Sequence, residues 1–145
     1  MRGARPLVAD AFLAEYRMTD EELVQGFESG ELPSEAFPHG AHVRVAWWYL
    51  RQHPILVALA RFRIGLQRFA AAKGKPGRYH ETITIACMLL IAERLEGARD
   101  LSWPAFAERN PDLIAWPSPA LARFYGDAVL ASADARQRFV LPEPL

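Results

Sequence analysis

Two of the four histidines in the chain, His39 and His42, lie three residues apart, where Pro38 and Gly40 mark the start of a helix. Residues at this spacing lie on the same side of a helix, about one turn apart. Imidazole is a common protein ligand for zinc, iron and copper, so the pair can form part of a metal site. The same spacing also fits a structural interpretation, in which one histidine caps the helix and the other hydrogen-bonds within the core.

A second polar cluster, Arg78-Tyr79-His80-Glu81, opens another apolar segment. Because neighbouring helical residues point about 100° apart, His80 is favoured over Glu81 as a ligand. The patterns together predict a mononuclear metal centre holding zinc, iron or copper. Its predicted ligands are His39, His42 and His80. Glu81 is the predicted acid/base or fourth ligand and, with Arg44, the predicted catalytic residue.

A metal-free site is the alternative for the same residues. Helix N-termini attract anions, so a small anionic ligand such as a carboxylate or phosphate would be bound there with Arg44 and Arg78. A related alternative is acid/base catalysis on an anionic substrate by a histidine and Glu81, which predicts a pocket lined by basic residues. Tyr79 and Tyr125 are further candidates for the lining of the site.

Three consecutive helices must position these residues, and the apolar periodicity predicts them at about 39–52, 54–72 and 79–95. His53-Pro54 separates the first two, and the run Gly74-Lys75-Pro76-Gly77 separates the second from the third. Short connections make successive helices antiparallel, so the first and third run in the same direction. Both histidine clusters are therefore expected at one end of the bundle.

Shorter helices are expected on both sides of these three. Thr19 and Glu22 form a capping-box pattern after an apolar stretch at about 8–16. N-cap serines are expected at Ser102, Ser118 and Ser132. No segment alternates with the period of a strand, so the sequence predicts an all-α fold with one domain over residues 1–145.

The composition excludes several classes of protein. The formal net charge is +0, which argues against a nucleic-acid partner. The longest apolar stretch is too short to span a bilayer, and no apolar run of signal-peptide length follows Met1. With one cysteine, Cys87, expected in the core, we expect a cytoplasmic protein without membrane association. The oligomeric state is left open, and a homo-oligomer remains an alternative.

Three segments carry a resemblance to known sequences: F-P-H-G-A-H-V-R-V-A-W, R-F-A-A-A-K-G-K-P-G-R-Y-H-E-T-I-T and A-R-Q-R-F-V-L-P-E-P. Together they resemble a family of small, uncharacterised, all-helical bacterial proteins, over the range from about Phe37 to the C-terminus. The resemblance implies no activity. It implies that the most polar positions of the pattern are His39, His42, Arg44, His80 and Glu81, with Tyr125 as a further one.

No G-x-S-x-G, P-loop, H-E-x-x-H or dinucleotide-binding motif is present. The sequence therefore predicts a metal-binding protein, with a mononuclear metalloenzyme acting on a small molecule as its enzymatic form. The alternative is a non-catalytic protein that binds a small molecule, an anion or a partner and whose histidines are structural.

Overall fold

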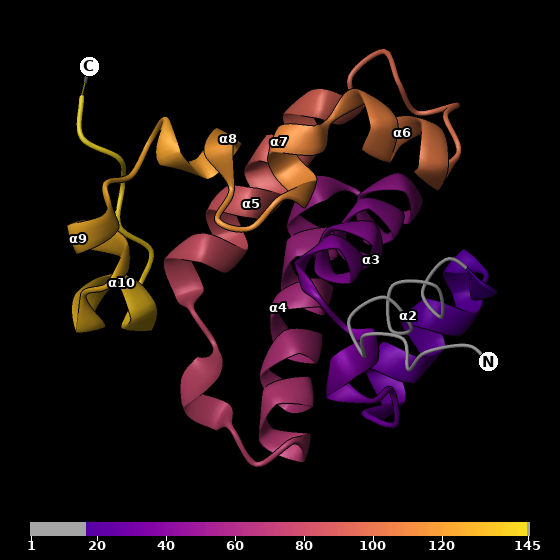
Figure 1. Cartoon of the computed structure of the whole chain (residues 1–145), viewed down its shortest axis with the longest axis horizontal. Helices are drawn as coiled ribbons and strands as arrows, with labels where there is room; N and C mark the ends of the chain where they lie inside the picture. The colour runs from indigo at the N-terminus through magenta and orange to yellow at the C-terminus, as the bar shows by residue number, and fades with distance from the viewer. Residues whose placement is uncertain (1–16, 145) are drawn as a thin grey trace, which may run out of the picture.

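A computed structural model describes residues 17–144, and over this range the chain is helical without strands (Figure 1). The all-α prediction is confirmed. The apolar stretch predicted at about 8–16 lies outside the described residues. The helices are α2 (Asp20–Ser29), η1 (Ser34–Ala36), α3 (His39–Gln52), α4 (Ile55–Ala72), η2 (Pro76–Arg78), α5 (Glu81–Leu95), α6 (Trp103–Arg109), α7 (Pro111–Ile114), α8 (Pro119–Ala122), α9 (Asp127–Leu130) and α10 (Ala133–Gln137).

Local capping chemistry determines where many of these helices begin. The Thr19 side chain accepts a hydrogen bond from the Glu22 amide, and the Glu22 carboxylate accepts one from the Thr19 amide, which completes the predicted capping box. The side chains of Ser102, Ser118 and Ser132 cap α6, α8 and α10 as predicted. These bonds satisfy backbone amides that have no partner within the helix.

The start of α5 differs from the prediction. The sequence predicts a helix from about Tyr79, but Pro76–Arg78 form a separate 3-10 turn and α5 begins at Glu81. His80 has extended backbone angles (φ −131°, ψ 110°), and its imidazole accepts a hydrogen bond from the Ile83 amide. The helix starts later because His80 is the N-cap residue and not a residue of the first turn.

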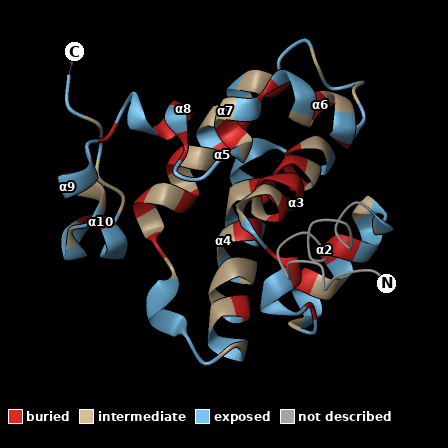
Figure 2. Cartoon of the chain, viewed as in Figure 1, coloured by how far each residue is buried: buried red, intermediate tan, exposed pale blue. Residues whose placement is uncertain are grey.

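Helices α3, α4 and α5 form the centre of the molecule, and α3 is buried along most of its length (Figure 2). Trp47, in the middle of α3, is 0 % exposed. At the far end, the Arg99 guanidinium donates a hydrogen bond to the Leu50 carbonyl over 3.1 Å, which joins the end of α3 to the segment after α5. The first residues of α3 and α5 lie together at the opposite end of the bundle. The prediction that these two helices run in the same direction is therefore confirmed.

The helices of the described range include none that is both long and apolar enough to cross a membrane.

A close approach between α2 and α4 depends on Gly65. A Cβ atom at this position would lie 2.6 Å from Cε2 and 2.9 Å from Cζ of Phe27, whose ring is fixed in the core at 1 % exposure. The phenyl ring therefore packs directly onto the backbone of α4.

We expect Gly65→Ala to lower the free energy of unfolding by up to about 2 kcal/mol, because the overpacking cost of about 1–3 kcal/mol is offset only in part by the gain of about 1 kcal/mol in helix propensity. Urea unfolding followed by circular dichroism measures the change. The control is Gly26→Ala in α2, whose Cβ would meet its nearest neighbour, Leu32 Cβ, at 3.4 Å. An equal effect of both substitutions would contradict the packing constraint.

Candidate functional site

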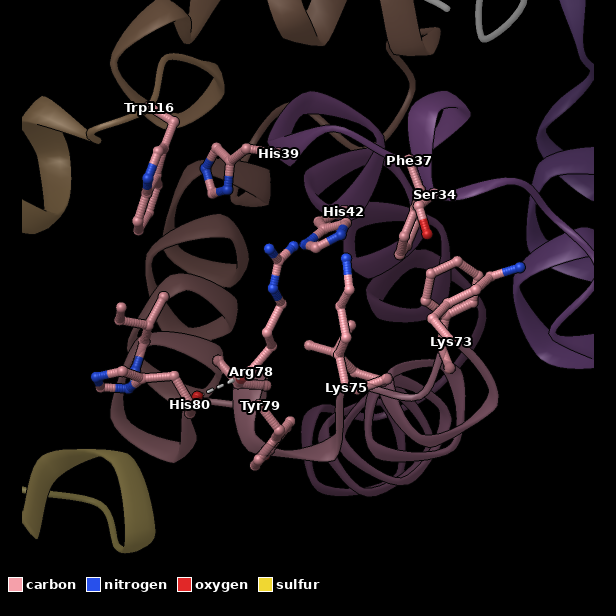
Figure 3. Close-up of a pocket in the computed structure, with 15 residues that line it drawn as sticks. Ser34, Phe37, His39, His42, Lys73, Lys75, Arg78, Tyr79, His80 and Trp116 are labelled. Carbon is pink, nitrogen blue, oxygen red and sulfur yellow. Dashed lines mark hydrogen bonds between the residues drawn. The ribbon is translucent and has the colours of Figure 1, made fainter. Parts of the chain in front are cut away.

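A cavity of about 380 Å³ lies where α3 and α5 begin (Figure 3). The C-terminal part of α4, the η2 turn and the segment after α7 complete its walls. All three histidines predicted as ligands contribute to it. The lining consists of Ser34, Phe37, His39, His42, Leu66, Phe69, Ala70, Lys73, Lys75, Arg78, Tyr79, His80, Ile83, Thr84 and Trp116.

His39 is fixed by a contact far away in the sequence. Its Nε2 lies 3.0 Å from the Leu113 carbonyl oxygen, and its ring lies 4.7 Å from the Trp116 ring between centroids. A carbonyl only accepts hydrogen bonds, so Nε2 carries the proton and Nδ1 of the neutral ring is an acceptor. Burial lowers the pKa of His39, although the bond to Leu113 opposes the shift.

His42 is enclosed between two rings. Its ring centroid lies 4.0 Å from that of Phe37 and 6.4 Å from that of His39. Burial, and next the proximity of His39, lower the pKa of His42 to about 3, while a hydrogen bond with the Phe37 backbone opposes the shift. His42 is therefore a neutral imidazole at pH 7.

His80 has both ring nitrogens engaged. Nδ1 accepts from the Ile83 amide over 3.1 Å, so Nε2 carries the proton and donates to the Leu130 carbonyl over 2.7 Å. The side chain thus caps α5 and attaches the last residue of α9, Leu130, to the start of α5. This arrangement matches the structural role that the sequence left open for one of the histidines.

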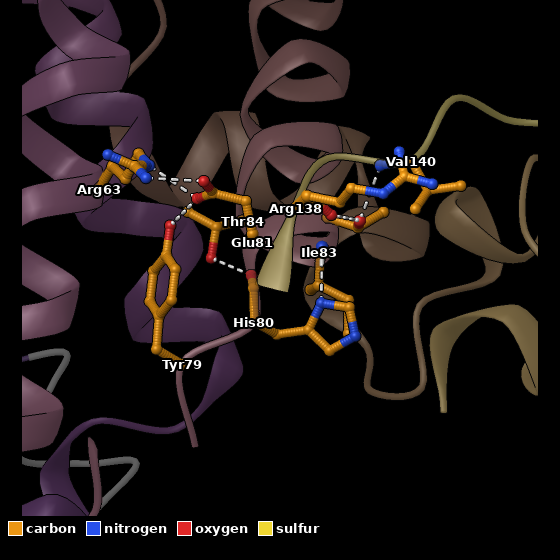
Figure 4. A network of polar contacts seen from close by, with 9 residues as sticks. Arg63, Tyr79, His80, Glu81, Ile83, Thr84, Arg138 and Val140 are labelled. Atoms are coloured by element: carbon orange, nitrogen blue, oxygen red, sulfur yellow. Dashed lines mark hydrogen bonds and ion pairs between the residues drawn. The ribbon is translucent and has the colours of Figure 1, made fainter. Parts of the chain in front are cut away.

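Glu81 is held in an ionic network away from the cavity lining (Figure 4). Its two carboxylate oxygens accept hydrogen bonds from the Arg63 guanidinium, each over 2.7 Å, and Oε1 accepts a third from the Tyr79 hydroxyl over 2.6 Å. Arg63 is the main cause of the lowered pKa of Glu81. The carboxylate is therefore ionised and already bound by two side chains.

Two other predicted residues contact groups outside the cavity lining. Arg44, 6 % exposed, forms an ion pair with Asp20 at 2.9 Å and donates to the Met18 carbonyl over 2.8 Å. These contacts join the start of α2 to α3. The Tyr125 hydroxyl donates to the Val140 carbonyl over 2.7 Å and so holds the C-terminal segment.

The predicted metal centre is brought together only in part. The three histidines line one cavity, yet residues 17–144 contain no group of three or more His, Cys, Asp or Glu side chains arranged to hold a metal ion. Binding through His80 would require it to give up its bond to the Ile83 amide or the Leu130 carbonyl. A metal centre with His39, His42 and His80 stays a prediction from the sequence.

The charged side chains of the lining are all cationic: they are Lys73, Lys75 and Arg78, and no Asp or Glu lines the cavity among the residues described. Lys73 donates to the Gly30 carbonyl over 3.1 Å and lies 5.1 Å from the centre of the Phe69 ring. Lys75 and Arg78 make no side-chain hydrogen bond or ion pair with any residue in the range 17–144. Both extend toward His42 in Figure 3.

Arg136, in the C-terminal segment, binds the backbone of the η2 turn that carries Arg78. One nitrogen of the Arg136 guanidinium lies 3.0 Å from the Gly77 carbonyl, 3.2 Å from that of Arg78 and 3.3 Å from that of Tyr79. The backbone of the turn is therefore anchored, while the Arg78 side chain is left to face the cavity.

Sequence reasoning places Arg78 at the site, includes Lys75 only in a wider basic stretch, and gives no indication of Trp116. A signal for Lys75 was present, since it lies three residues before Arg78 in a stretch from Arg51 to Arg78 that contains seven basic residues and no acidic one. For Trp116 there was no local signal, because its contact with His39 joins positions far apart in the chain.

The comparisons with known proteins add no relationship: no family model, no curated protein and no solved structure matches this chain. The resemblance to a family of small bacterial proteins therefore stays a prediction from the three sequence segments.

Removal of the His80 imidazole is expected to destabilise the fold. In His80→Ala the Ile83 amide loses its cap and the Leu130 carbonyl loses its donor, which together cost about 1–3 kcal/mol. His80→Asn is the matched control, because asparagine is a good N-cap and should restore part of the loss. Denaturant unfolding measures both. Unchanged stability in His80→Ala, combined with lost metal uptake, would instead support the ligand role.

The lowered pKa of His42 predicts a stability that falls with falling pH. The unfolded chain takes up a proton at a histidine pKa of about 6.5, whereas folded His42 resists protonation down to a pKa of about 3. The free energy of unfolding should therefore drop by about 2 kcal/mol between pH 7 and pH 5 through this group alone. His39 contributes in the same direction.

Urea unfolding of wild type and His42→Gln at pH 8, 7, 6 and 5 measures this effect. The free energy of unfolding of each protein is compared with that of the same protein at pH 8, so that packing effects of the substitution cancel. The variant should lose less stability than wild type on acidification. Parallel pH profiles would show that His42 is not the group responsible.

Proposed function

We propose that the protein binds a small organic anion, such as a carboxylate or a phosphate ester, in the cavity where α3 and α5 begin. The observation that carries the proposal is the charge of the lining, in which Lys73, Lys75 and Arg78 are cationic and no described acidic residue takes part. The side chains of two of the three, Lys75 and Arg78, make no hydrogen bond or ion pair with any described residue. A ligand anion would supply the missing counter-charge.

The cavity walls favour an anion with an apolar body over an inorganic ion. Phe37, Leu66, Phe69, Ile83 and Trp116 make up much of the lining. Burial of apolar ligand surface against such side chains contributes about 25 cal/mol per Å². A volume of about 380 Å³ also lies in the usual range for small-molecule sites, about 300–1,000 Å³.

The N-terminus of α3 adds to the positive potential. This helix of 14 residues begins at the cavity, and its N-cap residue, Pro38, makes no side-chain cap hydrogen bond. α5 differs, because His80 caps it. The first amides of α3 are thus the ones that remain to interact with a bound anion, and the helix dipole favours negative charge there.

Neutral His42 fits a binding role. With a pKa of about 3 it brings no charge at pH 7, but it can exchange hydrogen bonds with a ligand. Acid/base catalysis through Glu81 has less support, because Arg63 and Tyr79 already bind that carboxylate outside the lining. We therefore favour binding as the function of the cavity.

Binding of 4-phenylbutanoate, compared with the uncharged 4-phenylbutanamide, tests the proposal by isothermal titration calorimetry. The two probes share their body and differ in charge. We expect the carboxylate to bind and the amide to bind at least about tenfold more weakly, since a charge-assisted hydrogen bond contributes about 1.5–3 kcal/mol. Equal affinity for the two probes would overturn the proposal.

Two double variants that remove the same charge test whether the carboxylate binds at Lys75 and Arg78. Lys75→Ala with Arg78→Ala should weaken carboxylate binding about tenfold or more. Arg61→Ala with Arg68→Ala removes the same net charge from exposed positions of α4 that do not line the cavity, and should change affinity less than about twofold. Equal losses in both would indicate general electrostatic attraction without a specific site.

A further inference from the structure

A second, smaller cavity of about 50 Å³, called the inner cavity below, adjoins the first and is lined by residues of α3, α4 and α5 that extend toward the middle of α3 and α5. The two share part of their lining: His39, His42, Leu66, Ile83 and Thr84. The residues that line only the inner cavity are Val43, Ala46, Phe62, Cys87, Met88 and Ile91. The two cavities therefore adjoin at these five residues.

The inner cavity offers no charge to a ligand. Burial raises the pKa of the Cys87 thiol to about 12, so the thiol is protonated at pH 7. The Thr84 hydroxyl is already used, because it donates to the His80 carbonyl over 2.7 Å. Around them lie apolar side chains such as Met88 at 0 % and Ile91 at 1 % exposure. Apart from the imidazoles of His39 and His42, which it shares with the outer cavity, this space is lined by apolar or already hydrogen-bonded groups and favours an uncharged, apolar part of a ligand.

The size of the inner cavity fits the end of a ligand's alkyl chain. A single water-sized group needs about 10–15 Å³ of such volume, so about 50 Å³ accommodates about three to five such groups. The lining runs along α3 as far as Ala46 and along α5 as far as Ile91, about 10–12 Å beyond His39 and Ile83. A narrow, elongated space of this kind accommodates the end of an alkyl chain better than a ring.

We propose that the ligand is an amphiphilic anion with an unbranched alkyl chain, bound with its head group at Lys75 and Arg78 and its chain end in the inner cavity beyond His39 and His42. This inference rests on the proposed function and specifies the class of anion. Polarity changes in one direction along the path, from two unpaired cations through neutral imidazoles to apolar side chains. A straight-chain carboxylate or alkyl phosphate has the same order of groups.

Calorimetric titration with straight-chain carboxylates from pentanoate to dodecanoate tests the inference. We expect affinity to rise about three- to fourfold for each added methylene until the inner cavity is filled, and then to level off. If these acids bind with the Lys75 and Arg78 dependence described above but without dependence on chain length, the inference is overturned and the proposed function stands. If neither they nor 4-phenylbutanoate bind, both proposals are wrong.

A methionine methyl group reports where the chain end lies. Met88 lines the inner cavity, whereas Met18 lines neither cavity. In protein labelled with ¹³C at the methionine methyls, and with the signal assigned through Met88→Leu, decanoate should shift the Met88 resonance and pentanoate should not. The Met18 resonance serves as the internal control. A decanoate complex that leaves Met88 unshifted would contradict the placement of the chain.

A variant that narrows the inner cavity gives an independent check. Ala46→Val adds volume at a residue that lines only this space. It should reduce the affinity for decanoate by about tenfold or more while changing pentanoate binding less than about twofold. Ala60→Val, at an exposed position of α4, should change neither. Equal losses for both acids in Ala46→Val would show that the inner cavity does not hold the chain.

Discussion

The parallel packing of α3 and α5 is the constraint on which the rest of the structure depends. Two packed helices that run in the same direction place both of their N-termini at one end, and α4, which connects them along the chain, must run in the opposite direction. The η2 turn then has to pass from the end of α4 to the start of α5 beside this end. Lys75 and Arg78 face the cavity because they belong to that connection.

Hydrogen-bond partners and, for His42, desolvation explain why three histidines of one cavity have different roles. His80 satisfies a helix N-terminus and a distant carbonyl, so its imidazole is part of the scaffold. His39 donates one proton to the Leu113 carbonyl and keeps one acceptor. His42 is too enclosed to carry a charge at neutral pH, so the positive charge of the site comes from the exposed Lys75 and Arg78.

Most helix limits, though not the start of α5, and the relative direction of α3 and α5 could be predicted from the sequence, because both depend on local signals. The Thr19 capping box, the break at His53-Pro54 and the short connections are properties of neighbouring residues. The meeting of His39, His42 and His80 in one cavity followed from the same reasoning.

The partners of the polar side chains could not be predicted in this way. Arg44 binds Asp20, and Glu81 binds Arg63, through packing of helices far apart in the sequence. His80 contacts Leu130 for the same reason. Periodicity indicates which face of a helix is buried but not which residue lies opposite. The sequence therefore singled out polar residues but left open whether each one belongs to the scaffold or to a ligand.

A crystal structure of the protein with 4-(4-bromophenyl)butanoate, using the anomalous signal of bromine, tests the central claim most directly. We expect the carboxylate to contact Lys75 and Arg78, with the bromophenyl ring against apolar side chains of the cavity lining. A ligand bound elsewhere, or one oriented with its carboxylate away from both cations, would contradict the claim. An anomalous peak of a metal ion joined to His39 and His42 would favour the metal centre predicted from the sequence.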